Sequence, residues 1–344
     1  MKKNLIVFLS LVMILASSTD IVFAGGGKRN GTAGAQELLI PVGARGLALN
    51  GSYVSGISGA EAIYYNPAGL NAGSDNVEVL FSQMTYIADI NVSYAAVAAK
   101  FGDLGSMALS IKSLNFGDIN TTTEENPQGD GTTFSPNFVT IGLTYANNLT
   151  DNIKIGATAK LITEKIVRVG ATGFALDAGV QYSSFAGIEG LSLGVALKNL
   201  GPQMSFDGPD LLRMATDASA SRGVQFYQID AAGFDLPSQL EIGMAYAGEL
   251  AQDVHGLITT TYQDNNFLND EYKIGSELCF MNSFYVRGGY TYVPQSKTED
   301  DLPFGPTFGA GLKVDSGVKI IVDYGYRSSK LFGGNNVFSI KIGF

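Results

Sequence analysis

From residue 77 to its end, the chain places an apolar residue at every second position in many short segments. The last segment, 337–344, reads VFSIKIGF, so aromatic and aliphatic side chains alternate with Ser, Lys and Gly. Successive side chains of a β-strand point to opposite faces, and a period of two therefore indicates a strand with one apolar face. The fold must cover the apolar face of every such strand.

Fourteen segments of this kind follow one another almost without interruption: 77–87, 90–101, 106–114, 138–146, 153–164, 174–183, 191–199, 240–247, 254–263, 272–280, 284–292, 307–314, 318–327 and 337–344. The connections after even-numbered strands are short, whereas the long ones (115–137, 200–239 and 293–306) follow odd-numbered strands. An even strand count with short turns at one rim and long polar loops at the other is typical of outer-membrane β-barrels. A β-sandwich does not need this alternation.

The composition favours strands that face lipid. Hydrophobic residues make up 45% of the chain and charged residues only 16%, whereas ordinary soluble domains have about 25% charged residues. No run of ~18 apolar residues predicts a membrane helix. A charge on the lipid face at the bilayer midplane costs about 2–4 kcal/mol, so charged side chains should face the lumen. The predicted lumen-lining residues are Glu241, Lys273, Glu277, Arg287, Asp323, Arg327 and Lys341.

Both ends of the chain carry features of exported barrels. Residues 1–24 have the basic start, apolar run and small residues of a cleavable signal peptide. The aromatic Phe344 that ends the last strand is similar to the signal that the barrel assembly machinery reads. We therefore expect an outer-membrane protein in contact with lipid. The formal net charge of -10 argues against binding of nucleic acid.

The segment before the strands is of a different kind. Residues 43–70 read GARGLALNGSYVSGISGAEAIYYNPAGL, which lacks the alternation. Nearly every wall strand carries a glycine on the lumen face, and strand glycines mark a bend or the close approach of another backbone. The sequence thus predicts an all-β, transmembrane, 14-stranded antiparallel barrel (76–344) with an N-terminal hatch (25–75) in its lumen. Strand parity places both termini at the short-turn rim, from which the hatch would enter.

The segment 43–53, which opens with Gly-Ala-Arg, and the ending YYNPAGL at 64–70 together resemble the N-terminal signature of the PorV/PorQ family, a branch of the FadL-like outer-membrane proteins. The resemblance implies a hatch motif made of Gly43, Arg45, Tyr64, Tyr65, Asn66, Pro67 and Gly69. Pro67 also disfavours helix at Asn66, and Gly69 suits a positive φ. FadL relatives pass hydrophobic molecules, typically long-chain fatty acids, through the lumen. PorV-type relatives instead serve type IX secretion and hold cargo proteins at the cell surface, and both functions stay open.

Little in the chain indicates an enzyme. His255 and Cys279 are the sole residues of their types, and neither a nucleophile elbow nor a zinc ligand set is present. We expect no catalytic residue, cofactor or metal. Acidic clusters in two long loops are interpreted as solvated rather than as cation sites. The longest loop, 200–239, holds a helix-like apolar stretch at 211–215 and is predicted to act as a lid or a docking element for a partner.

Overall fold

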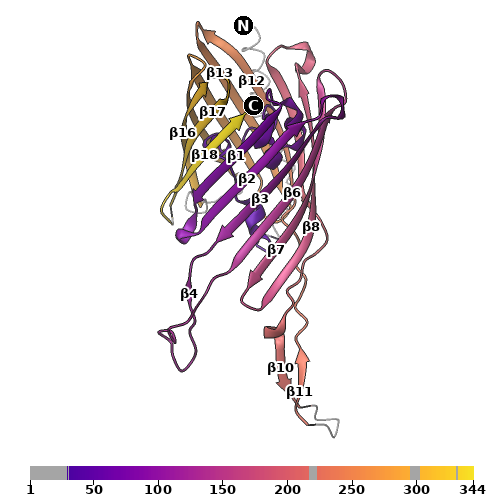
Figure 1. The fold of residues 1–344 in the computed structure, drawn as a ribbon, viewed down its shortest axis with the longest axis vertical. Coiled ribbons are helices and arrows are strands. Elements are labelled where there is room, and N and C mark those ends of the chain that lie inside the picture. Colours follow the sequence, from indigo (N-terminus) through magenta and orange to yellow (C-terminus); the bar gives the residue numbers. More distant parts are fainter. Residues whose placement is uncertain (1–28, 30, 217–222, 295–302, 331) are drawn as a thin grey trace.

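The computed structural model describes residues 29, 31–216, 223–294, 303–330 and 332–344, so the predicted signal peptide lies outside the described residues. Fourteen antiparallel strands form a closed barrel in which sequence neighbours pair and the first wall strand pairs with the last (Figure 1). The wall strands are β1 (Val77–Thr85), β2 (Asn91–Lys100), β3 (Ser106–Asn115), β6 (Asn137–Asn148), β7 (Ile153–Ile166), β8 (Val169–Ser183), β9 (Leu191–Leu200), β12 (Gln239–Ala251), β13 (Val254–Asn265), β14 (Glu271–Phe280), β15 (Phe284–Tyr292), β16 (Phe304–Asp315), β17 (Lys319–Ser329) and β18 (Asn335–Gly343). All fourteen predicted strands are present.

The alternation of the sequence becomes an alternation of faces. On β18, Phe338 is 59% exposed on the outside of the barrel, whereas its neighbour Ser339 is 2% exposed in the lumen. The same pattern holds for exposed Val286 beside buried Arg287 on β15. Apolar side chains thus form the outer surface of the wall, and the polar positions are buried inside it.

The lumen holds the N-terminal part of the described chain, residues 29 and 31–75, which we call the hatch. It holds the 3₁₀-helices η1 (Gln36–Leu39), η2 (Gly59–Glu61) and η3 (Pro67–Ala72) and the α-helices α2 (Ala44–Ala48) and α3 (Ala62–Tyr65). Figure 1 shows these indigo elements enclosed by the strands. None of the helices in the described part of the chain combines the length and apolarity that a bilayer-spanning helix requires.

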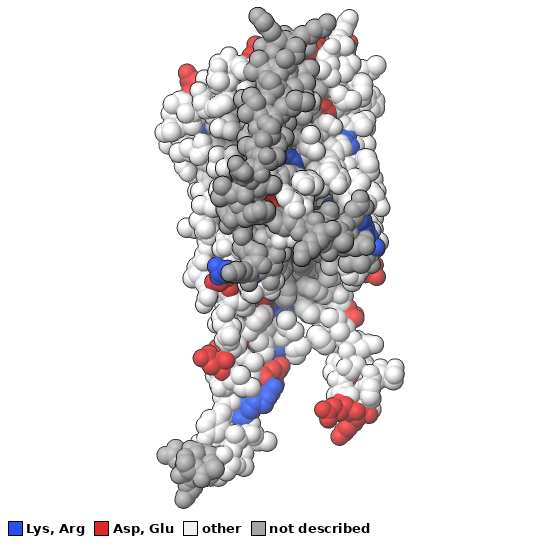
Figure 2. Space-filling view, turned by 180° about the vertical axis from the view of Figure 1, so that it is seen from behind, with Lys and Arg blue, Asp and Glu red and all other residues white. Residues whose placement is uncertain are grey.

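The barrel has two unlike rims. The short-turn rim carries the turns 101–105, 149–152, 184–190, 252–253, 281–283 and 316–318, in which lie the 3₁₀-helices η5 (Gly102–Leu104) and η6 (Phe185–Gly187). The long-loop rim carries η4 (Ile87–Asp89), η7 (Pro209–Leu211) and two hairpins that project far from the barrel (Figure 1): β4 (Ile119–Asn120) with β5 (Thr133–Phe134), and β10 (Leu212–Ala215) with β11 (Gln225–Gln228). Acidic side chains gather at the tip of the β4–β5 loop (Figure 2).

Two expectations, one for the long loop 200–239 and one for the hatch, are wrong. The stretch 211–215 does not form the expected helix: Leu211 ends the short η7 turn, and residues 212–215 form β10, in which Met214 pairs with Phe226 of β11. Such a short helix is unstable without tertiary packing, and Met214 is 69% exposed, so strand pairing satisfies the backbone instead.

The hatch also does not enter from the short-turn rim. Arg29 and Gly31 bond to Asp235 and Phe267 at the long-loop rim. The chain then runs down the lumen and reaches β1 at the other rim, where Phe344 pairs with Val77. The even number of strands determines the rim at which β1 starts. It does not determine the path of the chain before β1, which here passes through the lumen from the opposite rim.

Candidate functional site

A belt of glycines on the inner wall receives the hatch. Eight of these glycines form directly opposed pairs across neighbouring strands: Gly309 with Gly325, Gly275 with Gly289, Gly194 with Gly243, and Gly156 with Gly179. A β-carbon added at any of the eight would lie within 2.8 Å of a hatch atom. The glycines therefore let the backbone of the hatch approach the wall more closely than any side chain allows.

The hatch meets this belt in sequence order around the barrel. Ala44 lies at Gly325 of β17, Ala48 at Gly309 of β16, and the contacts continue through residues 49–55 to Pro67 at Gly156 of β7. Three wall hydroxyls add bonds at the same level: Thr307 Oγ1 donates to Ala48 O (2.8 Å), Thr261 Oγ1 donates to Ser52 O (2.7 Å), and Thr259 Oγ1 shares a hydrogen bond with Ser52 Oγ (2.6 Å). The hatch is thus wound along the wall as a continuous layer.

Below the belt, toward the short-turn rim, six charged groups join hatch and wall. Arg45 of the hatch makes a bidentate pair with Glu277 of β14, both bonds being 2.9 Å long. Arg287 of β15 connects Glu277 to Asp323 of β17. The hatch residue Glu61 lies 3.7 Å from Arg45 and 3.7 Å from Lys341 of β18. Three positive and three negative side chains balance, and all are largely shielded from solvent.

The predicted lumen residues divide between two places. Glu277, Arg287, Asp323 and Lys341 belong to this buried network, which also takes in the hatch residue Arg45. Glu241, Lys273 and Arg327 lie higher, in a cavity described below. Burial alone would lower the pKa of the Arg45 guanidinium, but Glu277, Tyr53 and Glu61 together hold that pKa well above its ordinary value. Arg45 is therefore a permanent cation.

Sequence reasoning missed Glu61. It is 4% exposed and takes part in the network through its carboxylate. The signal was present in the sequence, because Arg45 and Glu61 are the sole charged residues of the segment 43–70. Two opposite charges in an otherwise uncharged buried segment are expected to share a network.

The hatch motif residues have separate structural roles. Gly43 precedes α2 with φ 78°, a value that disfavours other residues. The Tyr65 hydroxyl donates to Val42 O at 2.9 Å, and the Tyr64 hydroxyl donates to Leu38 O at 3.2 Å. Burial raises the pKa of both hydroxyls, so each is a neutral donor.

Asn66 is the hydrogen-bonding centre of the motif. Its side chain is fully buried, donates to Val54 O (2.9 Å) and Val180 O (3.1 Å), and accepts from the Ala68 amide. Asn66 is extended (φ -156°, ψ 105°), as Pro67 requires. Gly69 does not use the positive φ that we expected. Its hydrogen faces Ile57 O, and close packing is the reason for glycine there.

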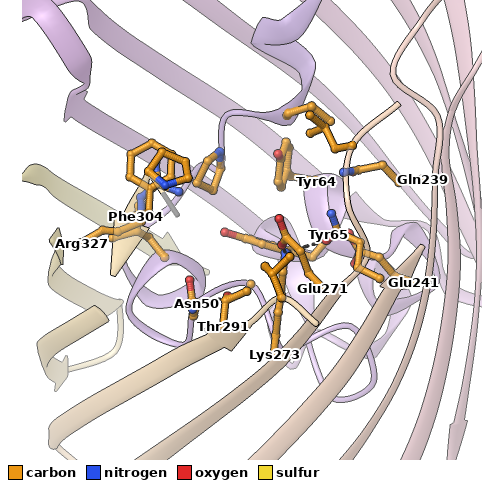
Figure 3. A pocket seen from close by; sticks show the side chains of 18 of the residues that line it. Asn50, Tyr64, Tyr65, Gln239, Glu241, Glu271, Lys273, Thr291, Phe304 and Arg327 are labelled. Atoms are coloured by element: carbon orange, nitrogen blue, oxygen red, sulfur yellow. Dashed lines mark hydrogen bonds and ion pairs between the residues drawn. The ribbon is translucent and has the colours of Figure 1, made fainter. Parts of the chain in front are cut away.

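Above the hatch, toward the long-loop rim, lies a cavity of about 290 Å³. Figure 3 shows Tyr64 and Tyr65 of the hatch together with wall residues from β12, β14, β15 and β17 that lie around them. Leu39, Leu47 and Phe304 add apolar surface. The cavity therefore combines an aromatic and aliphatic lining with polar side chains that converge from several strands.

The charged residues of the cavity are held in place by partners. Glu241 pairs with Lys198 of β9 at 2.7 Å, and Lys273 pairs with Glu271 at 3.0 Å. Arg327 stacks on the ring of Phe304, 3.5 Å from its centroid, and donates to Asn335. The Lys198 ammonium also lies 4.9 Å from the centroid of the Tyr64 ring. A polar group that enters this cavity meets preformed donors, and an apolar group meets the tyrosines.

In the described ranges, no cluster of three or more His, Cys, Asp or Glu side chains is arranged to hold a metal ion.

Comparison with solved structures identifies the barrel type. The CymD monoaromatic hydrocarbon channel aligns with a TM-score of 0.55 and 13% identity over 89% of this chain and 98% of that chain. The P. putida toluene transporter TodX aligns with a TM-score of 0.55 and 14% identity over 88% and 98%. A Pseudomonas aeruginosa FadL homologue aligns with a TM-score of 0.51 and 11% identity over 89% and 98%. At these identities the likeness shows a shared fold. No protein-family model and no curated protein sequence matches the chain.

Proposed function

We propose that this chain is an outer-membrane, FadL-like barrel that binds hydrophobic small molecules in its lumen and passes them across the membrane. The arrangement of the lumen carries the proposal: an amphipathic cavity of about 290 Å³ lies directly on a hatch that fills the barrel below it. Ligand sites are concave and mostly apolar, with a few placed polar groups. The fold shared with hydrocarbon and toluene transporters supports the same reading.

The outer surface supports a membrane location. Aromatic and aliphatic side chains such as Phe284, Phe308 and Phe338 are more than half exposed on the outside of the wall. In water they would form an apolar band far larger than soluble monomers show. Export by the signal peptide 1–24 and insertion by the barrel assembly machinery through Phe344 belong to this proposal.

The cavity suits a molecule with an apolar body and one polar end. Tyr64, Leu39 and Phe304 offer the apolar surface, and Arg327 and Lys273 offer donors. A long-chain fatty acid and a substituted monoaromatic compound both have this character. Asn66, Pro67 and Gly69 then keep the hatch closed while the cavity is filled.

The test is binding by the purified barrel in detergent, followed with a fluorescent fatty acid and by mass spectrometry of co-purified lipids. Leu39→Trp should fill the cavity and weaken binding at least tenfold. Phe308→Ala, which removes an exposed ring from the outer face, is the matched control and should bind as the parent does. Equal binding by both variants would exclude the cavity as the site, and uptake by a deletion strain equal to that of the parent strain would exclude the transport role.

A second function is favoured by the β10–β11 hairpin. Met214 and Phe226 pair on one face and are 69% and 72% exposed, far from the barrel wall (Figure 1). Exposed apolar faces of this kind mark binding surfaces for proteins. The chain would then act as a PorV-like component of type IX secretion that binds or shuttles cargo proteins. Pull-down with the intact protein and with the hairpin removed distinguishes the two, and a genome without type IX machinery would exclude this role.

A further inference from the structure

The first part of the hatch, residues 29 and 31–41, crosses the long-loop rim before it enters the lumen, and we call it the strap. Arg29 donates to the Asp235 carboxylate at 2.7 Å, and its guanidinium lies 4.4 Å from the centroid of the Phe267 ring. The Gly31 amide donates to Phe267 O at 3.2 Å. The strap is thus attached to two different loops of the same rim.

One of these loops is 201–238, which carries the β10–β11 hairpin, and the strap is attached to its base. Ala33 bridges to Asp235, and the Gly34 amide donates to Asp235 O at 3.1 Å. A β-carbon at Gly34 would collide with the Phe234 ring, so the strap lies directly against that ring. Ala35 and Leu38 are buried in one cluster with Met204 and Leu236 of the loop base and with the wall residues Ile162, Ala171 and Ala175.

The base of the loop is itself well ordered. Met204 and Phe234 exchange two backbone hydrogen bonds of 3.0 and 2.8 Å, which continue the β9–β12 ladder beyond the wall. Gly170 and Asp207 do the same on the β8 side, with two bonds of 2.9 Å. The loop base therefore forms a fixed clamp, and the strap is the element held by it.

The inner end of the strap borders the cavity. Gln36, Leu39 and Pro41 are part of its lining. Two wall side chains hydrogen-bond to this part of the strap. The Lys112 ammonium donates to Glu37 O (2.7 Å) and Ile40 O (3.2 Å), and the Glu164 side chain of β7 hydrogen-bonds to the Glu37 side chain. The six-charge network lies below the cavity and does not involve the strap.

We propose that the strap is a lid over the cavity and that the base of the 201–238 loop holds it shut, so that this loop regulates access from the long-loop side. Movement of the strap away from Phe234 and Asp235 exposes the cavity while the glycine belt and the ionic network stay intact. For ligand entry the inference rests on the proposed function, but access to the cavity is measurable without a ligand.

The experiment uses thiol labelling of the full-length barrel in a Cys279→Ser background. Thr291→Cys, on the cavity wall, serves as the reporter. Ala33→Cys and Asp235→Cys add a disulfide between strap and loop base. Oxidation should slow labelling of the reporter by a water-soluble maleimide at least tenfold, and reduction of the same protein should restore it. Equal labelling rates in the oxidised and reduced protein would overturn the proposal that the strap is a lid.

Two controls separate the lid from general effects. A wall-to-wall disulfide at the same rim, Ser113→Cys with Val139→Cys, which are opposed in the β3–β6 ladder, should leave the reporter rate unchanged. Phe234→Ala should raise the rate at least fivefold, and the exposed Phe226→Ala should not. Heat-modifiable migration confirms that each variant is folded. If the lid responds as expected and no ligand binds, the proposed function fails while this inference stands.

Discussion

The two halves of the lumen are built differently. In the short-turn half, the hatch lies against paired glycines and is joined to four wall strands by the Arg45 network, whose Arg287 is 4% exposed. In the long-loop half, the strap is attached by groups such as Arg29, whose side chain is 52% exposed, and a cavity of about 290 Å³ remains open beside it.

This difference indicates which half resists opening. Removing one partner of a buried ion pair costs about 3–5 kcal/mol, because the other charge stays buried and unpaired. An exposed ion pair contributes about 0–1 kcal/mol. The short-turn half therefore acts as the seal of the lumen. The first movement of the hatch is expected in the long-loop half, where the strap lies.

The largest effect should follow from breaking the network. Arg287→Met leaves Glu277 and Asp323 without their shared partner and should lower the free energy of unfolding by about 3–5 kcal/mol. Urea titration in detergent measures this, and leakage of large antibiotics into cells reports on the seal. Arg168→Met is the matched control: Arg168 pairs with Asp210 at 3.6 Å on an exposed loop, and a loss above about 1 kcal/mol there would contradict the comparison.

The next effect should come from the glycine belt. Gly289→Val places a branched side chain against Leu49 and Asn50 of the hatch and should cost about 1–3 kcal/mol by overpacking. Its neighbour Gly288 faces outward, where an added β-carbon meets one atom at 3.7 Å, so Gly288→Val should be tolerated. Thermal unfolding of the two variants side by side is the measurement. Equal melting temperatures would mean that the hatch does not press on the wall.

The sequence predicted the wall better than its contents. Alternation is a local property, and it placed the charges of residues such as Glu277 and Arg327 on the lumen side. Lumen glycines such as Gly194 and Gly289 pointed to close packing by a second backbone, which the structure has.

The partners within the lumen needed three-dimensional information. Arg45 and Glu277 are far apart in the chain, and no periodic pattern pairs them. Whether a charged lumen residue belongs to the ionic network or to the cavity depends on its position along the barrel axis. The path of the strap to Asp235 was likewise unpredictable, because a short glycine-rich segment has no period to follow.

A smaller effect is expected from the centre of the hatch motif. Asn66→Ala removes the donor to Val54 O and Val180 O from a fully buried site and should cost about 1–3 kcal/mol. Asn148→Ala removes one exposed hydrogen bond with Asn71 and should change stability by no more than about 0.5 kcal/mol. Urea titration of both variants tests whether Asn66 belongs to the seal. If Asn66→Ala lowers the free energy of unfolding no more than Asn148→Ala does, Asn66 is not part of the seal.

The smallest change in stability should come from the strap, and it separates stability from access. Arg29→Gln removes an exposed ion pair with Asp235, so the free energy of unfolding should fall by less than about 1 kcal/mol, and by less still at high salt. Labelling of the Thr291→Cys reporter should nevertheless become faster, because one of the contacts that holds the lid is lost. If Arg29→Gln destabilises the barrel as much as Arg287→Met does, the strap is part of the seal and the two halves of the lumen are mechanically one.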